Sequence, residues 1–226
     1  DYSEAALYGS IFRQCLLSGA RLERAALIGS DLSQSTMDAA RLDGATLDNC
    51  IMEKVSMLGS SAYEASFVGA QLRLVRLLDA DIRSADFTGS TLEQVDFTGA
   101  DARDCSFAGA DLRNSIFVGA RLQGATLRGS KLDGAIFDQC LLKDVDLRGA
   151  SVEGANFSGS LGLEREQLIQ LAERGARVDE LKADTLRGSL GVSQLRAAVA
   201  LFSLGLGSYL FTSYLASQQP NIDALE

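Results

Sequence analysis

The chain has 226 residues, a formal net charge of −9 and neither histidine nor tryptophan. The lack of histidine excludes Ser-His-Asp and Cys-His hydrolases, histidine-ligated metal sites and histidine-based acid–base catalysis. The acidic balance argues against a basic surface for phosphate backbones, so we expect no nucleic-acid ligand.

A period of five residues runs without insertion through residues 1–160. The thirty-two positions that leave remainder two on division by five are hydrophobic, and only Ala62 and Ala102 among them are small. The multiples of five are 16 Ala, 8 Ser, 4 Cys and 4 Val. A period of five fits neither a helix nor a strand, so we expect the chain to turn a corner in every repeat. One large and one small side chain would then point inward from each repeat.

These repeats resemble the unit A-(D/N)-L-x-x of the pentapeptide-repeat family. The segments that carry the resemblance include ADFTG at residues 85–89, ADLRN at 110–114 and ANFSG at 155–159. The resemblance implies an all-β solenoid: a right-handed, four-sided β-helix with four repeats in each coil. Residues 1–160 would then form about eight coils.

Coils of twenty residues place side chains twenty apart directly above one another. We therefore expect two inner aromatic ladders on opposite sides of the solenoid. Glycine occupies twelve of the sixteen positions that end in nine. This rhythm predicts that two opposite corners use a tight turn that the other two corners do not. The ladder residues are Phe67, Phe87 and Phe107 on one side, and Phe97, Phe117, Phe137 and Phe157 on the other.

Cysteine and aspartate have plain structural interpretations here. All four cysteines fall on multiples of five and on four different sides, so we expect small buried thiols without a disulfide or metal cluster. The aspartates before the central residues are interleaved with arginine, and we expect solvated surface groups rather than catalytic or calcium-binding carboxylates. The sequence therefore predicts no enzyme, no cofactor and no small-molecule substrate. These residues are Cys15, Cys50, Cys105 and Cys140, and Asp81, Asp86, Asp96, Asp101 and Asp111.

The residues that flank each central side chain form the outer surface of the predicted solenoid. Two opposite sides carry 21 charges in 32 flanking positions, whereas the other two carry 9 in 32. Apolar residues on one of the drier sides predict a docking surface for a protein partner. This set consists of Leu16, Leu58, Leu78, Ile116, Val118 and Ile136.

The family resemblance also implies an alternative function. Some pentapeptide-repeat proteins protect gyrase from quinolones by imitating DNA with a strongly acidic rod and a C-terminal dimer seam. Here arginine alternates with aspartate on the sides, and no continuous acidic stripe is present. A soluble DNA mimic that binds a topoisomerase and dimerises through residues 192–218 therefore stays as the alternative.

The repeat ends at residue 160, and residues 161–190 are predicted to form a helical cap and linker. Apolar residues at helical spacing precede Gly175, which we expect to end the helix. A solenoid needs such a cap because its last coil presents unpaired backbone groups and apolar side chains. The apolar residues are Leu163, Leu168, Ile169 and Leu171.

Residues 191–226 are predicted to form one long hydrophobic helix and a tail. Residues 197–216 carry no charge, and twenty residues of helix span about 30 Å, the hydrocarbon thickness of a bilayer. The segment is interpreted as a membrane anchor, with a helix in a soluble assembly or dimer as the alternative. The residues expected to contact lipid or a partner are Val199, Phe202, Leu206, Leu210, Phe211 and Tyr214.

The sequence as a whole predicts a non-enzymatic scaffold: a rigid rod tethered by its C-terminal helix to a membrane or a membrane protein complex. The expected partners are proteins, together with membrane lipid. Because the family is plentiful in cyanobacteria and plastids, the resemblance implies a thylakoid setting and an accessory subunit of a photosynthetic assembly. A cytoplasmic location is the alternative.

Overall fold

A computed structural model of the chain describes residues 1–179. Residues Asp1–Arg177 form one compact unit, which contains the repeats and the segment that follows them. The predicted hydrophobic helix lies outside the described residues, as does the end of the predicted cap from residue 180. The same holds for the contact residues expected there, namely Val199, Phe202, Leu206, Leu210, Phe211 and Tyr214.

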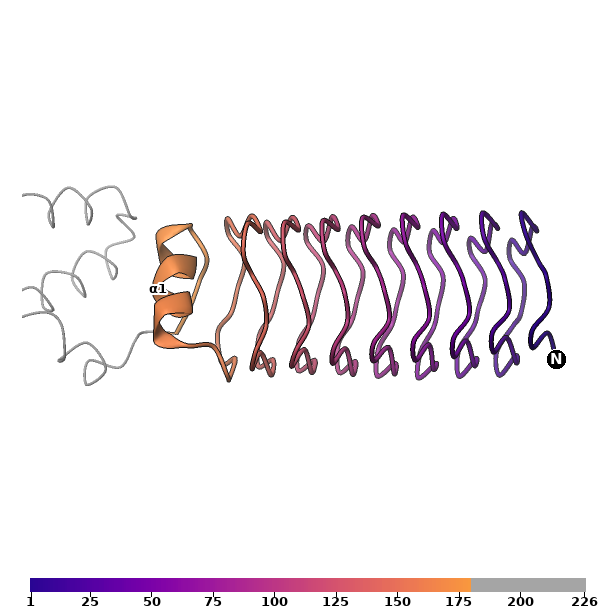
Figure 1. Cartoon of the computed structure of the whole chain (residues 1–226), viewed down its shortest axis with the longest axis horizontal. Coiled ribbons are helices and arrows are strands. Elements are labelled where there is room, and N and C mark those ends of the chain that lie inside the picture. The colour runs from indigo at the N-terminus through magenta and orange to yellow at the C-terminus, as the bar shows by residue number, and fades with distance from the viewer. Residues whose placement is uncertain (180–226) are drawn as a thin grey trace, which may run out of the picture. The chain divides into compact units, whose positions relative to one another are not determined.

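The repeats wind into a four-sided solenoid in which each side is one pentapeptide (Figure 1). Within the repeats, each side contributes a single parallel bridge to the coil above and the coil below, between residues twenty apart. The bridges run from Ala6 and Ala26 to Leu141 and Leu161. Eight coils of twenty residues therefore stack along one axis, as the period of five predicts.

Three backbone hydrogen bonds per repeat hold successive coils together. The N–H of Leu112 donates to the carbonyl of Lys131 at 2.8 Å, and the N–H of Lys131 donates back to Ala110 at 2.9 Å. The third bond joins the corner, where the N–H of Gly109 donates to the carbonyl of Arg128 at 2.9 Å. Since every N–H at a central residue and a corner points toward the following coil, each coil needs a successor to satisfy it.

The predicted aromatic ladders are confirmed. The rings of Phe67 and Phe87 are stacked with centroids 4.7 Å apart, and those of Phe97 and Phe117 with centroids 4.6 Å apart. The two ladders also meet edge to face across the narrow interior, as in the 6.2 Å contact of Phe87 with Phe97. These phenylalanines are fully buried, so the rod contains one continuous apolar core.

The small inner residues satisfy a carbonyl group as well as filling space. The thiol of Cys105 donates to the carbonyl of Ile82 at 2.7 Å, and the hydroxyl of Ser115 donates in the same way to Leu92 at 2.5 Å. Burial raises the pKa of the Cys50 thiol to about 11 and that of Cys140 to about 12. Cys50, Cys105 and Cys140 are buried free thiols, as predicted, and act here as equivalents of serine. Cys15, which was also predicted to be buried, is only partly so.

The prediction that only two corners use a tight turn was wrong. All four corners of every coil have positive φ, whether the residue is Gly99 at +70° or Gln94 at +59°. Glycine is needed at particular corners for a second reason. A Cβ at Gly99 would meet the Asp79 carboxylate, which folds over that corner from the preceding coil, closer than real Cβ atoms approach. Eight of the twelve glycines at positions ending in nine have nothing within 4 Å of an added Cβ, so crowding explains individual corners such as Gly99 and not the glycine rhythm as a whole.

Helix α1 (Arg165–Glu173) follows the last coil and lies across its end (Figure 1). Its first turn is closed by a capping box in which the N–H of Glu164 donates to the side chain of Gln167 at 2.9 Å. Leu171 is buried at 2% exposure, whereas the other apolar residues expected on this face are only partly covered. After α1 the chain returns to the rod, where Arg177 forms a bridge with Asn156.

Candidate interaction surface

Aspartates before the central residues have a structural role that the sequence interpretation did not assign. The carboxylate of Asp86 accepts the N–H of Thr88 at 2.9 Å, and Asp96 accepts the N–H of Thr98 at 3.0 Å. Each such carboxylate therefore satisfies the backbone of its own repeat just before the corner, as in an Asx turn. This bond explains why Asp or Asn suits the second position of the unit.

At several of these positions an arginine two residues later also donates hydrogen bonds to the carboxylate oxygens. Arg83 binds Asp81 through two parallel bonds of 2.8 and 2.7 Å, and Arg148 binds Asp146 at 2.8 and 2.6 Å. The hydrogen bond from Arg148 lowers the pKa of Asp146 to about 2, and that from Arg83 lowers the pKa of Asp81. The carboxylates are thus neutralised locally, within one repeat.

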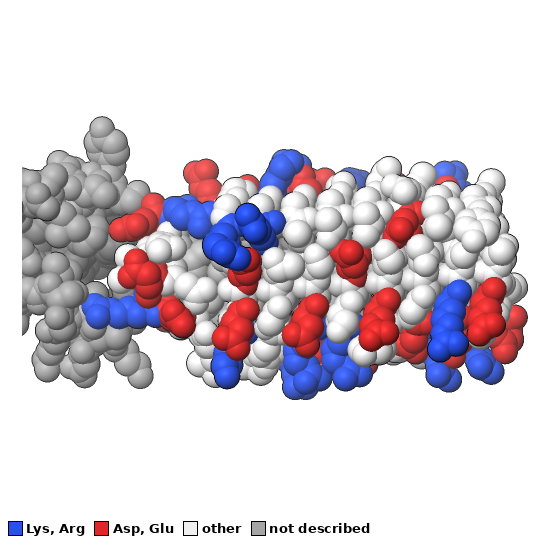
Figure 2. All heavy atoms as spheres, in the orientation of Figure 1, with Lys and Arg blue, Asp and Glu red and all other residues white. Residues whose placement is uncertain are grey.

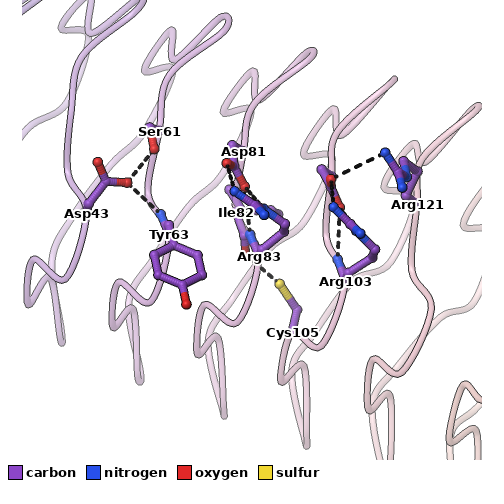
Figure 3. Close-up of polar contacts among 10 residues, drawn as sticks. Asp43, Ser61, Tyr63, Asp81, Ile82, Arg83, Arg103, Cys105 and Arg121 are labelled. Atoms are coloured by element: carbon purple, nitrogen blue, oxygen red, sulfur yellow. Dashed lines mark hydrogen bonds and ion pairs between the residues drawn. The ribbon is translucent and has the colours of Figure 1, made fainter.

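Figure 3 shows the pair of Asp81 with Arg83 and, in the next coil, Arg103 on one side of the rod. The guanidinium of Arg83 lies 5.4 Å from the centre of the Tyr63 ring. In the next coil Asp101 holds Arg103 and also lies 3.6 Å from Arg121. These charges pair with one another, which leaves no convergent acid, base and nucleophile on this side.

Figure 2 shows the same interleaving over one face of the rod, where acidic and basic side chains alternate along its length. Within residues 1–179 no group of three or more metal-ligating side chains is close enough to hold an ion. In the same range no helix combines the length and the apolar character that crossing a bilayer requires.

The docking residues predicted from the sequence lie on one of the two sides that carry few charges. Ile116 and Ile136 are bridged neighbours in adjacent coils, and Val118 flanks the same central residue as Ile116. Leu58 and Leu78 stand twenty residues apart in two earlier coils of the same side. These five side chains are half-buried, and we call them the apolar side.

The structure divides the predicted docking set. Thr98, hydrogen-bonded to Asp96, lies between the leucine pair and the isoleucine–valine cluster of the apolar side. Leu16 is 88% exposed, but Thr36 and Ser56 separate it from the rest along the bridge column, so it does not join the apolar side.

Sequence reasoning did not single out Arg76, which lies on the same side in the repeat of Leu78. Within the described part of the chain Arg76 forms no ion pair, unlike the arginines bound to Asp81, Asp101 and Asp146. Its bridge partner in the next coil is Asp96, whose carboxylate accepts hydrogen bonds from Thr98. The sequence shows that Arg76 lies two residues before Leu78. It does not show that other arginines are paired with aspartates, and this pairing is what distinguishes them from Arg76. A cation without an ion-pair partner beside two leucines suits a ligand that is apolar and carries a carboxylate.

A family profile described as pentapeptide repeats matches eight copies, over residues 3–38, 40–77, 80–119 and 120–159. The chain belongs to the pentapeptide-repeat family. Members of this family known from solved structures form right-handed β-helices, which agrees with the four-sided rod of residues 1–160. No curated protein matches the chain.

Several solved pentapeptide-repeat proteins are similar to this chain. QnrB1, a plasmid-mediated fluoroquinolone resistance protein, is 22% identical with a TM-score of 0.51 and covers 84% of this chain and 90% of its own. HetL, involved in heterocyst differentiation regulation in the cyanobacterium Nostoc sp. strain PCC 7120, is 24% identical with a TM-score of 0.40 and coverages of 77% and 85%. A pentapeptide-repeat protein of the Arabidopsis thaliana thylakoid lumen is 23% identical with a TM-score of 0.21 and coverages of 58% and 87%. At these identities the likeness concerns the fold alone.

Proposed function

We propose that this pentapeptide-repeat chain is a non-enzymatic interaction protein whose rigid rod binds a protein partner through the apolar side. The observation that carries the proposal is the contrast between the sides. Elsewhere on the rod, arginines are held by carboxylates such as those of Asp81 and Asp146. On the apolar side Arg76 forms no ion pair within residues 1–179 and stands beside Leu78, and the carboxylate of its bridge partner Asp96 binds Thr98 instead.

The partner surface that fits is an apolar strip with one carboxylate. Leu58 and Leu78 offer one apolar contact, and Ile116, Val118 and Ile136 offer another farther along the rod. A carboxylate opposite Arg76 would form an ion pair that becomes stronger as the neighbouring apolar contacts exclude water.

The test compares two charged substitutions in the full chain at native abundance. Leu78→Glu places a carboxylate within the apolar side, and Gln71→Glu places one at an exposed position on a different side. Both variants must first melt like the parent. The proposal is supported if a protein co-purifies with the parent and with Gln71→Glu but is lost with Leu78→Glu. Equal recovery with both variants refutes docking at this side.

A tether supplied by residues 191–226 completes the proposal. Residues 197–216 are uncharged and long enough to span a bilayer as a helix, which favours attachment to a membrane or a membrane protein complex. Family resemblance favours a thylakoid membrane of a cyanobacterium or plastid, with the rod as an accessory subunit of a photosynthetic assembly. Carbonate extraction of native membranes tests the tether, since release of the full chain into the soluble fraction would contradict it.

A soluble DNA mimic that binds a topoisomerase is the second candidate. The net charge of −9 and the fold shared with QnrB1 favour it. The pairing of Asp81, Asp101 and Asp146 with arginine weakens it, because a DNA mimic needs carboxylates that are free to replace phosphates. A gyrase supercoiling assay with and without quinolone separates the two candidates, since only the mimic changes gyrase activity.

A further inference from the structure

The bridge ladder stops at the last coil on two of its four sides, those of Asp146 and Ser151. On the Ser151 side the N–H of Gly154 still donates to the carbonyl of Gly175 at 3.0 Å, and on the Asp146 side no such bond is present within the described residues. On the side centred on Leu147, parallel bridges join every coil up to the pair Thr126 and Asp146, and there the ladder stops within the described residues. Two other sides are continued beyond the eighth coil. Leu161 pairs with Leu141 on one of them, and Arg177 pairs with Asn156 on the other.

Backbone donors are left without acceptors where the ladder stops. In the seventh coil, the N–H of Leu127 donates to Asp146 at 2.8 Å and that of Gly129 donates to Arg148 at 2.9 Å. Leu147 and Gly149 occupy the equivalent positions one coil later, and neither N–H has an acceptor among residues 1–179. Leu147 is only 7% exposed, so bulk water satisfies its N–H poorly.

Helix α1 takes the place of a ninth coil here but does not supply its backbone bonds. The carbonyl of Val145 receives the side-chain amide of Gln167 at 3.3 Å, where a ninth coil would offer a backbone N–H. Between α1 and the rod lies a cavity of about 610 Å³. Residues 144–149 form one wall, and Gln167, Gln170, Leu171 and Arg174 form the other. We call this cavity the terminal groove.

We propose that the terminal groove binds an extended peptide segment of a partner protein, which adds the missing rung to the ladder. Carbonyl groups of the segment accept the N–H groups of Leu147 and Gly149, and one of its own N–H groups displaces Gln167 from Val145. The donors are two residues apart, which is the spacing of an extended chain. A helix would not suit them, because its carbonyls are already used internally.

The other wall specifies the side chains that such a segment carries. Leu171, at 2% exposure, covers the end of the inner core, so the inward residue of the segment must be small or apolar. Arg174 has no acidic partner within the described range and lines the same groove, which favours a carboxylate on the face of the segment toward α1. This site is separate from the apolar side, and its existence does not depend on the function proposed above.

The experiment uses the full chain, labelled with ¹⁵N, and a synthetic peptide of the sequence KDVDLRG. This peptide copies residues 143–149. In the protein, these residues pair with the same side of the seventh coil, so the peptide should pair in the same way with the eighth coil. Titration is expected to shift the amide signals of Leu147 and Gly149 and to slow their hydrogen exchange. The same peptide with an N-methyl group at its second aspartate loses one hydrogen bond and is expected to bind about fivefold more weakly.

Two protein variants complete the design. Gln167→Ala removes the side chain that competes for Val145 and is expected to tighten binding, whereas Arg174→Ala is expected to weaken it. Three results would overturn the proposal. The amides of Leu147 and Gly149 could already be protected from exchange in the free chain, which would mean that the chain covers its own edge. The peptide could bind without shifting either amide signal, or it could fail to bind at millimolar concentration. The N-methyl control leaves the protein unaltered, so a folding defect cannot produce the expected difference.

Discussion

The guanidinium of Arg103 holds the carboxylate of Asp101 through two bonds of 2.7 Å, and both residues belong to the same pentapeptide. The pair closes over the central Ala102, and the carboxylate also lies within 3.6 Å of Arg121 in the next coil. Such pairs make the rod's carboxylates part of its structure rather than free surface charges. This arrangement has consequences for stability at low pH.

We expect the thermal stability of the rod to fall at acid pH as these carboxylates are protonated. Hydrogen bonds from the neighbouring arginines lower the pKa of Asp81 and lower that of Asp146 to about 2. A carboxyl group with a lowered folded-state pKa contributes stability above its unfolded pKa of about 3.9, and loses it as the pH falls through the folded value. The melting midpoint, followed by circular dichroism, should be level from about pH 8 to 5 and fall between about pH 4 and 2.

A variant that removes the pairs tests this cause. The double variant Asp81→Asn, Asp146→Asn should melt below the parent at pH 7 and lose less of its stability between about pH 4 and 2. Asp138→Asn is the matched control, because Asp138 has no ion pair among the residues that the structure describes. An acid transition of equal depth in the parent and the double variant would show that other groups cause it.

The buried thiols should be inert in the folded chain. Burial raises the pKa of Cys50 to about 11 and that of Cys140 to about 12, and also raises the pKa of Cys105. Since the thiolate is the nucleophile, iodoacetamide at about pH 8 should label only the partly exposed Cys15 in the native chain, and all four cysteines after unfolding. Rapid native labelling of Cys105, detected by mass spectrometry, would contradict its place in the core.

Cys105 also tests the hydrogen bond to the core carbonyl. Ser115 makes the same bond, so Cys105→Ser should cost less than about 1 kcal/mol of unfolding free energy. Cys105→Val fills similar space without a donor, leaves the carbonyl of Ile82 with only the N–H of Ala85 at 3.1 Å, and should cost about 0.5–1.5 kcal/mol more than Cys105→Ser. Urea unfolding of the two variants measures the difference, and equal stabilities would mean that this bond contributes nothing.

Much of the rod could be predicted from the sequence, because its period leaves few alternatives. A strict period of five with no insertion fixes which side chains are twenty apart, so the stacking of Phe67 on Phe87 follows from the sequence alone. The edge-to-face contact of Phe87 with Phe97 did not follow, since it depends on how wide the interior is. The repeat therefore predicts stacking along the axis better than contacts across it.

Features that depend on local hydrogen bonds were missed. Composition marks Asp86 as a polar surface residue, but only the backbone shows that it accepts the N–H of Thr88. The terminal groove was missed for a different reason. Its open N–H groups at Leu147 and Gly149 arise from the path of α1, and the sequence predicts that a helix caps the end without predicting which side it leaves unpaired.

Glycine corners provide a matched test of crowding. Gly99→Ala and Gly109→Ala both place a Cβ at positive φ, +70° and +66°, which costs about 1 kcal/mol through backbone strain. At Gly99 the new Cβ also meets the Asp79 carboxylate, whereas at Gly109 nothing lies within 4 Å. Gly99→Ala should therefore be the more destabilising change in urea unfolding, and combining it with Asp79→Ala should remove the excess. Equal costs at both corners would mean that the Asp79 carboxylate does not crowd the corner at Gly99.

The narrow interior makes the small inner positions the most sensitive in the rod. Ala110 is completely buried between successive coils, and no space is open for a larger side chain. Ala110→Phe should therefore destabilise the chain by about 1–3 kcal/mol or more, because the walls must move apart against the bonds between coils. Ala108→Phe, in the adjoining outward position of the neighbouring side, should change stability by no more than about 0.5 kcal/mol. If thermal melting shows the two variants to be equally stable, residues at multiples of five do not limit the width of the channel.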